Sequence, residues 1–312
     1  MTMKAVRYHS YGATDVLVFE EADHPEAGVG QVVVQVAGAA FNPVDASIRA
    51  GYFPEVFPLV MPHVPCYDVA GVVAEVGEGV TNWRVGDAVM AFLPIAGRGA
   101  AAEYVAAPAE VLAPAPRTGD LADAAALPSV GLTAWQAMFE HIGLKLNQTV
   151  LINGAGGAVG AYAVQFAEQA GAVVTATASA RSRDRVESYG VHRIIDYTET
   201  PLHEALAGQR FDAVLNLVPP GPEDLTRLLD LVDDGGAFAN TIPPGPESAD
   251  RGVRTLQVFG RSDADQLAEL ARQVDAGDLK IHVAQRRPLS DLRAVHEEAA
   301  AGELPGKTVL IP

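Results

Sequence analysis

The sequence predicts an α/β protein of two domains, a mostly β barrel or sandwich followed by a doubly wound parallel sheet. Its 312 residues are enough for two domains of ordinary size, and a 49% hydrophobic content is that of a globular protein. Short β-branched runs dominate up to about residue 111, and alternating strand and helix patterns follow the Pro-rich connector Ala113-Pro-Ala-Pro. The change of pattern at this connector predicts the change of domain.

The β-rich half consists of short runs separated by Pro and Gly clusters that mark turns. The runs are Gln31-Val-Val-Val-Gln-Val-Ala, Val69-Ala-Gly-Val-Val-Ala-Glu-Val, Asp87-Ala-Val-Met-Ala-Phe and Ala102-Glu-Tyr-Val. In the second half we predict strands at 150–153, 172–178, 193–195, 211–217 and 236–241, with helices at 159–170 and 183–189. This spacing is typical of βαβ units, which build a parallel sheet.

The C-terminal segment predicts a return to the first domain. A helix at 265–275 leads into the run Ile281-His-Val-Ala, and Thr308-Val-Leu-Ile forms a closing strand. The predicted first domain therefore comprises residues 1–121 and 263–312, and the second, residues 122–262, is an insertion.

Charge and cysteine content exclude several classes of function. The formal net charge is −17 and the acidic residues are scattered, so a polyanion would be repelled and nucleic acid is not expected as a partner. No window holds about 20 uninterrupted apolar residues, and the N-terminus has no long apolar run, so we expect a soluble cytoplasmic protein without a membrane segment. Cys66 is the single cysteine, which excludes an internal disulfide and a zinc site built from several thiolates.

A glycine-rich turn, Asn153-Gly-Ala-Gly-Gly-Ala-Val-Gly, lies between an apolar strand and a helical pattern. Such a turn needs positive φ, room for backbone to approach a pyrophosphate and close packing of helix on strand. The helix that follows would direct its first amides at the phosphate. The pattern predicts a dinucleotide site, and the alternative is a purely structural turn. The predicted contacts are Gly154, Gly156, Gly157, Ala158, Val159 and Gly160.

The end of the second predicted strand favours NADPH over NADH. Sites for NAD usually carry an acidic residue about 20 residues past the glycines, whereas NADP sites carry small polar and cationic groups. Here Ser179, Arg181 and Arg183 occupy the stretch, with no acid before Asp184. One charge-assisted hydrogen bond contributes roughly 1.5–3 kcal/mol, a preference of about 10- to 150-fold. The alternative is that these arginines form the solvated first turn of a helix.

Four stretches carry a resemblance to a known family: Phe41-Asn-Pro-Val-Asp, Val69-Ala-Gly-Val-Val-Ala-Glu-Val-Gly, Gly131-Leu-Thr-Ala-Trp and the glycine loop. They resemble the zinc-independent quinone oxidoreductase branch of the medium-chain dehydrogenase/reductase superfamily. The resemblance implies a GroES-like β-barrel domain that carries the catalytic residues, a Rossmann domain that binds NADPH, and a homodimer.

The resemblance also allows a test for the catalytic metal of zinc-dependent relatives. Those relatives place a cysteine where Asn42 stands, histidine and glutamate where Tyr67 and Asp68 stand, and a later cysteine near Ser129. A catalytic zinc needs three protein ligands, and Asp68 alone could not hold the ion, so no metal is expected. Cys66 stands where this branch normally has glycine. We interpret it as a small buried residue rather than a reactive thiol, and His63 as an ordinary loop or core residue.

By the same resemblance, Asn42, Tyr52 and Thr133 are the candidate catalytic residues. Asn42 would lie beside the nicotinamide with its amide polarising a carbonyl, although Asn before Pro is also a frequent turn former. Tyr52 would donate a hydrogen bond to a developing oxyanion or else pack half-buried, and Thr133 would meet the nicotinamide ribose or carboxamide or else lie in the core. The remaining candidate cofactor contacts are Tyr197 near the adenosine phosphate and, through backbone at the strand ends, Asn216, Leu217, Val218, Thr241 and Ile242.

These expectations favour a metal-independent, NADPH-dependent oxidoreductase that transfers hydride to a quinone. Reduction of the activated C=C bond of an enone or enoyl compound is the alternative within the same chemistry. The loops at 51–62 and 242–254, expected to form the acceptor pocket, do not specify a substrate. The sequence lacks the metal ligands that a metal-dependent alcohol dehydrogenase needs. A non-catalytic NADPH sensor or a crystallin-like structural protein would have the same fold and is the remaining alternative.

Overall fold

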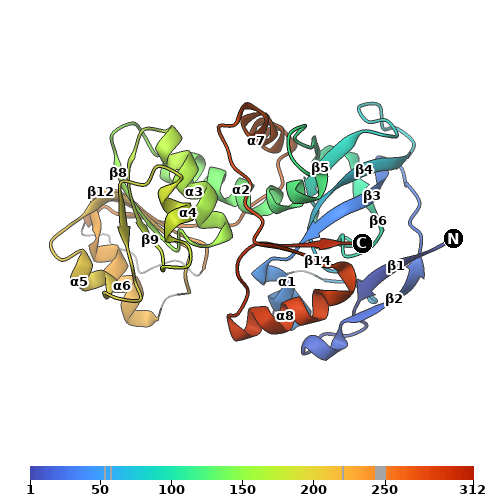
Figure 1. Cartoon of the computed structure of the whole chain (residues 1–312), viewed down its shortest axis with the longest axis horizontal. Coiled ribbons are helices and arrows are strands. Elements are labelled where there is room, and N and C mark those ends of the chain that lie inside the picture. The colour runs from blue at the N-terminus through green and yellow to red at the C-terminus, as the bar shows by residue number, and fades with distance from the viewer. Residues whose placement is uncertain (53, 57, 220, 243–250) are drawn as a thin grey trace. The chain divides into compact units, whose positions relative to one another are not determined.

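The computed structural model of the chain describes residues 1–52, 54–56, 58–219, 221–242 and 251–312 (Figure 1). The chain divides into two compact units. The first comprises Met1–Ser129 and Ser262–Pro312, and the second comprises Val130–Arg261. The boundary at which the chain passes from the first unit to the second lies after Ser129, eight residues beyond the boundary predicted from the sequence.

The first unit is built on a mainly antiparallel sheet of seven strands. The strand order is β14-β15-β3-β4-β5-β7, and β6 also pairs with β3. These strands are β3 (Gln31–Ala40), β4 (Asp68–Val76), β5 (Ala88–Phe92), β6 (Tyr104–Pro108), β7 (Leu112–Pro114), β14 (Gln285–Pro288) and β15 (Thr308–Ile311). Because β15 pairs with β3, the C-terminal segment completes the sheet that the N-terminal segment begins.

Smaller elements complete this unit. A separate hairpin pairs β1 (Thr2–Arg7) with β2 (Val18–Asp23). The helices are α1 (Pro43–Arg49), α7 (Ala264–Ala276) and α8 (Leu292–Ala301). Sequence reasoning missed α1 and α8, and the run 281–284 lies immediately before β14. The buried positions of α8, Leu292, Val295 and His296, follow helical spacing, so this helix carried a readable pattern.

The second unit is a six-stranded parallel sheet with the order β10-β9-β8-β11-β12-β13. Its strands are β8 (Thr149–Asn153), β9 (Val173–Thr177), β10 (Arg193–Ile195), β11 (Phe211–Asn216), β12 (Val232–Asn240) and β13 (Arg254–Gln257). This is the Rossmann order, in which the direction of winding reverses between β8 and β11. Val150, Leu151 and Ile152 are fully buried, as expected for a strand covered on both faces.

Helices connect these strands. They are α3 (Ala158–Gln169), α4 (Arg183–Glu187), α5 (Leu202–Ala205) and α6 (Pro222–Asp230). The unit begins within α2 (Pro128–Trp135), which continues as a π-helix over Gln136–Ile142. Sequence reasoning missed the edge strand β13.

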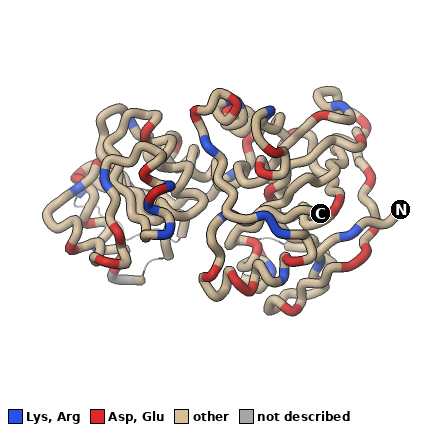
Figure 2. The backbone as a smooth tube through the Cα atoms, viewed as in Figure 1, with Lys and Arg blue, Asp and Glu red and all other residues tan. Residues whose placement is uncertain are grey.

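Figure 2 shows Asp and Glu distributed over both units rather than gathered in one tract. In the described part of the chain, no helix is both long and apolar enough to cross a membrane.

Candidate functional site

The glycine loop of the second unit is short and closely packed. β8 ends at Asn153 and α3 begins at Ala158, so only four residues connect them. Gly154 has φ of +98°, a conformation that favours glycine. A Cβ on Gly160 would lie 2.3 Å from the carbonyl oxygen of Gly154 and 2.6 Å from Cα of Ala155. Glycine at these two positions therefore lets α3 start directly against the loop.

The N-terminus of α3 is suited to a phosphate group. Its N-cap is Gly157, so no side chain caps the first amides of this 12-residue helix. Uncapped amides and the positive end of the helix dipole favour an anion at this position. The loop and helix together fit the pyrophosphate of a dinucleotide.

A row of polar side chains crosses the carboxyl edge of the sheet beside this loop. Thr177 Oγ1 donates to Asn153 Oδ1 at 2.9 Å, Asn153 Nδ2 donates to Asn216 Oδ1 at 2.8 Å, and Asn216 Nδ2 donates to Asn240 Oδ1 at 3.1 Å. The row also holds the loop, because the Gly154 amide donates to Thr177 Oγ1 at 2.8 Å. It spans the reversal point between β8 and β11, where doubly wound folds bind their ligands. Sequence reasoning named only Asn216 of this row, although each member ends a buried strand.

The polar stretch after β9 turns into α4. The Ser179 carbonyl accepts the amides of Ser182 and Arg183. Arg181 is exposed, and the Arg183 guanidinium lies 3.5 Å from the exposed Glu187 carboxylate. Arg185, which sequence reasoning missed, donates from Nη2 to the Gly156 carbonyl at 2.8 Å. Arg185 therefore fixes the glycine loop, while Arg181 and Arg183 remain the candidates for a 2′-phosphate.

The other predicted cofactor residues lie near the same edge. Tyr197 is 56% exposed and Val218 is 41% exposed, whereas Leu217, Thr241 and Ile242 are half-buried. The Leu217 amide donates to the Asn153 carbonyl, and the Thr241 amide donates to the Asn216 carbonyl. Residues 243–250 of the predicted acceptor loop lie outside the described residues, as do residues 53 and 57 of the loop at 51–62.

In the first unit, Asn42 precedes α1 but does not cap it with its side chain. Pro43 occupies the first helical position, where a missing N–H costs no hydrogen bond. The Asn42 amide N–H donates to Asp45 Oδ2 at 2.8 Å, and the Asp45 amide donates to the Asn42 carbonyl at 2.9 Å. The main chain and Asp45 thus form the turn, and the Asn42 side chain has other partners.

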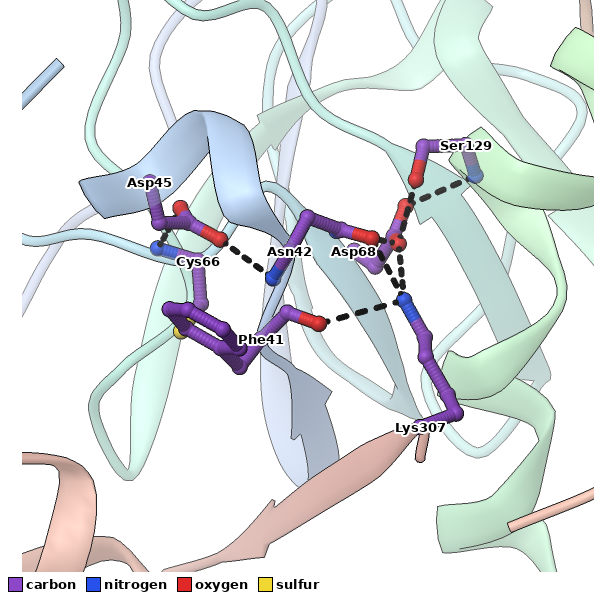
Figure 3. Close-up of polar contacts among 7 residues, drawn as sticks. All are labelled: Phe41, Asn42, Asp45, Cys66, Asp68, Ser129 and Lys307. Carbon is purple, nitrogen blue, oxygen red and sulfur yellow. Dashed lines mark hydrogen bonds and ion pairs between the residues drawn. The ribbon is translucent and has the colours of Figure 1, made fainter. Parts of the chain in front are cut away.

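Those partners form a buried network (Figure 3). Lys307 Nζ donates to Asn42 Oδ1 at 2.7 Å. It also lies 3.2 Å from Asp68 Oδ2 and 3.4 Å from the Phe41 carbonyl oxygen. Asn42 Nδ2 donates to Asp68 Oδ2 at 2.9 Å. Ser129 donates to Asp68 from its amide at 2.8 Å and from its hydroxyl at 2.6 Å. The Lys307 side chain is 3% exposed and that of Asp68 is 0% exposed, so this is a buried ion pair. Sequence reasoning missed Lys307.

Asp45 and Cys66 pack beside this network. Asp45 Oδ1 accepts the Cys66 amide at 2.9 Å, and burial raises the pKa of the Asp45 carboxyl to about 7. Cys66 is fully buried, and burial raises the pKa of its thiol well above the usual range. The interpretation of Cys66 as a buried residue is confirmed, because a buried neutral thiol is a poor nucleophile. Its φ of +68° explains why glycine would suit this position.

The four positions at which the resemblance places zinc ligands carry other side chains, each with its own partners. Asn42, Asp68 and Ser129 belong to the buried network, and the Tyr67 hydroxyl lies 3.0 Å from His63 Nε2. His63 is 1% exposed, which confirms it as a core residue, and burial lowers its pKa to about 4. An amide, a phenol, a hydroxyl and a carboxylate held by four hydrogen bonds do not fit a catalytic zinc. No group of three His, Cys, Asp or Glu side chains among the described residues could hold a metal.

The other two candidate catalytic residues lie in different surroundings. Tyr52 is 73% exposed, and its amide donates to the Ser47 carbonyl. Thr133 is half-buried in α2 and faces Gly260, where a Cβ would lie 2.2 Å from Thr133 Oγ1. The exposure of Tyr52 does not fit the alternative of a half-buried packing tyrosine. Contacts of Tyr52 or Thr133 with a cofactor or acceptor stay predictions.

Comparison with known proteins places the chain in a family. Residues 28–117 match the family Alcohol dehydrogenase GroES-like domain, and residues 189–310 match Zinc-binding dehydrogenase. The chain is 33% identical to the chloroplast envelope quinone oxidoreductase homolog of Arabidopsis thaliana, over 99% of this chain and 98% of the relative. The chain belongs to the quinone oxidoreductase branch of the medium-chain dehydrogenase/reductase superfamily. It is therefore an oxidoreductase with a nicotinamide cofactor.

Two further similarities cover most of the chain. It is 32% identical to the NADPH-dependent alkenal/one oxidoreductase of Arabidopsis thaliana, over 99% of this chain and 80% of the relative. Among solved structures, the quinone oxidoreductase from Coxiella burnetii matches over 100% of both chains with a TM-score of 0.89 and 28% identity. The predicted fold class, a GroES-like domain with a Rossmann domain, is confirmed.

Proposed function

We propose that the protein is a metal-independent, NADPH-dependent reductase that transfers hydride to a quinone. The buried network around Asn42 carries this proposal. It joins the Asn42 amide and the Asp68 carboxylate, at positions where the resemblance places zinc ligands, to the Lys307 ammonium, and none of its members is a soft metal ligand. The similarity to quinone oxidoreductases over nearly the whole chain supports it.

The residues of the chain have separate tasks in this reaction. The glycine loop and the N-terminus of α3 bind the pyrophosphate, and Arg181 and Arg183 bind the 2′-phosphate that distinguishes NADPH from NADH. Bound NADPH supplies the hydride. The Asn42 amide donates to the acceptor oxygen, where negative charge develops as the acceptor is reduced. Water supplies the remaining proton.

Reduction of an enone is the second candidate. The similarity to an NADPH-dependent alkenal/one oxidoreductase favours it. Hydride addition to an enone also places negative charge on a carbonyl oxygen, so the same amide donor serves both reactions. We also propose that the protein is a cytoplasmic homodimer, on the resemblance and the absence of an apolar segment in the sequence.

The test is NADPH oxidation by chelator-treated protein, with para-benzoquinone and methyl vinyl ketone at matched concentrations. Faster turnover of the quinone supports the first function, and faster turnover of the ketone supports the second. Loss of activity on chelation would contradict metal independence. No oxidation with either acceptor would favour a non-catalytic NADPH sensor.

Asn42→Ala tests the role of the amide. We expect kcat to fall about 100- to 1000-fold, the usual cost of losing one donor to a developing oxyanion, with little change in the Kd for NADPH. Ser47→Ala, on the same helix, is the control and is expected to leave kcat unchanged. An unaltered kcat in Asn42→Ala would remove Asn42 from the reaction.

A further inference from the structure

The orientation of the Asn42 amide is fixed by the chemistry of its two partners. A lysine ammonium can only donate hydrogen bonds, and a carboxylate can only accept them. Asp68 receives four donors, two from Ser129 and one each from Asn42 and Lys307, so it acts as an acceptor. Oδ1 of Asn42 must therefore face Lys307, and Nδ2 must face Asp68, as the distances of 2.7 Å and 2.9 Å show.

This arrangement engages only one of the two amide N–H groups of Asn42, a residue that is 6% exposed. One of the two hydrogens on Asn42 Nδ2 is directed to Asp68. Among the described residues, the structure gives Nδ2 no second acceptor. The three donors of Lys307 match three acceptors: Asn42 Oδ1, Asp68 Oδ2 and the Phe41 carbonyl. The hydrogen-bonding groups of Lys307 and Asp68 are thus all engaged by neighbouring residues, whereas one N–H of Asn42 Nδ2 has no acceptor among the described residues.

We propose that Lys307 is a positioning residue that turns Asn42 into a charge-assisted donor for the acceptor oxygen. The ammonium draws electron density toward Oδ1, and the remaining N–H of the same amide becomes a stronger donor. Asp68 neutralises the buried ammonium and fixes the amide plane, so the amide needs no reorganisation when charge develops. The inference rests on the proposed function and names its substrate class: acceptors that place charge on a carbonyl oxygen.

A variant series built on Lys307→Met tests this. Met keeps much of the length of the side chain and removes the charge and the donors. We expect kcat to fall about 10- to 100-fold, since a hydrogen bond to a charged group contributes roughly 1.5–3 kcal/mol, with little change in the Kd for NADPH. Lys307→Arg retains the charge and is expected to restore part of kcat. Lys4→Met, an exposed lysine of the same unit, is the control.

The decisive readout is the coupling between Lys307 and Asn42. In the Asn42→Ala background, Lys307→Met is expected to lower kcat no further, because Lys307 acts only through the amide. Independent, multiplicative losses would overturn the proposal. So would a Kd for NADPH that rises tenfold in Lys307→Met and not in Asn42→Ala, because Lys307 would then bind the cofactor itself.

A second double variant separates positioning from simple charge balance. Lys307→Met alone leaves Asp68 buried without its counter-charge and lowers stability. Asp68→Asn combined with Lys307→Met removes both charges. Recovery of kcat in this double variant would mean that Lys307 only balances Asp68, whereas a kcat that stays low supports positioning.

Urea unfolding of the protein without cofactor tests the Lys307–Asn42 contact even if the proposed function fails. The midpoint shifts of Lys307→Met and Asn42→Ala are expected to be non-additive, because the two side chains share one hydrogen bond. Additive shifts would overturn the proposal. A wild-type protein that oxidises NADPH with neither acceptor, yet shows coupled midpoints, would reject the proposed function while retaining the Lys307–Asn42 pair.

Discussion

The two candidate regions, the glycine loop of the second unit and the buried network of the first, are built in opposite ways. The glycine loop is contained in eight consecutive residues, 153–160, and uses backbone amides and neutral side chains. The network in the first unit joins four segments of the chain, with Asn42 and Lys307 separated by 265 residues, and it contains a buried ion pair. A local motif is visible in a sequence, whereas a site assembled by the topology is visible only after folding.

In the glycine loop, Gly160→Ala is expected to affect both cofactor binding and stability. Its Cβ would meet backbone atoms at 2.3 Å and 2.6 Å, so α3 must move away from the loop. We expect the Kd for NADPH to rise on the order of 100-fold, since displacements of about 1 Å have costs of that size. Stability is expected to fall by about 1–3 kcal/mol. NADPH titration and urea unfolding measure the two effects.

Gly157→Ala is the comparison variant, at a predicted cofactor contact of the same loop that lacks the close approach found at Gly160. Its Cβ would lie 3.3 Å from the Gly154 carbonyl oxygen, and its φ of −80° suits any residue. We expect a far smaller change in Kd. Equal losses in both variants would mean that flexibility of the loop, rather than the close approach at Gly160, is what the glycines provide.

The same contrast shows how far sequence reasoning reached. The loop, the parallel sheet and the cation-rich end of β9 follow local patterns and were predictable. Asn42 was reached by resemblance, but Lys307 was missed because one lysine before a closing strand has no local feature that indicates burial. Its partner Asp68 lies on β4, and only the pairing of β15 with β3, and of β3 with β4, brings the two together.

Cofactor preference provides the next test, because two sets of arginines differ in their partners. Arg181→Ala with Arg183→Ala is expected to raise the KM for NADPH about 10- to 150-fold and to leave that for NADH nearly unchanged. Arg185→Ala should raise both, because Arg185 holds the Gly156 carbonyl of a loop that serves either cofactor. Steady-state kinetics with both cofactors distinguish the two patterns. Equal effects of the first variant on NADPH and NADH would reject the 2′-phosphate assignment.

Acid sensitivity is expected to differ between the two units. Burial lowers the pKa of His63 to about 4 and that of His296 to about 3, so their contribution to stability is present above the unfolded pKa and is lost as pH falls. Asp45, with a pKa of about 7, acts in the opposite direction, since its contribution is lost as pH rises. Between about pH 6 and 5 the unfolded state binds roughly one proton more than the folded state. The free energy of unfolding therefore falls by about 1.4 kcal/mol for each pH unit of acidification.

The two tryptophans make this measurable, because Trp83 lies in the first unit and Trp135 in the second. Fluorescence of Trp135→Phe then follows the first unit, and that of Trp83→Phe follows the second. We expect the Trp83 signal to change at the higher pH. Asp45→Asn removes the opposing group and should steepen the loss to about 2.7 kcal/mol per pH unit. Coincident transitions that Asp45→Asn leaves unchanged would contradict this account.

The smallest effect concerns the backbone beside the network. Cys66 has a φ of +68°, its backbone N–H donates a hydrogen bond to Asp45 Oδ1, and its carbonyl accepts the Ala100 amide. Cys66→Ala and Cys66→Gly both remove the buried thiol, but only glycine adopts this conformation without strain. Glycine also makes the unfolded chain more flexible, which offsets part of this gain. We expect the free energy of unfolding of Cys66→Gly, measured in urea, to exceed that of Cys66→Ala by about 0.5–1 kcal/mol. Equal stability of Cys66→Ala and Cys66→Gly would contradict this. It would mean that the hydrogen bonds to Asp45 and from Ala100 do not hold residue 66 at positive φ, and that the turn relaxes in the alanine variant.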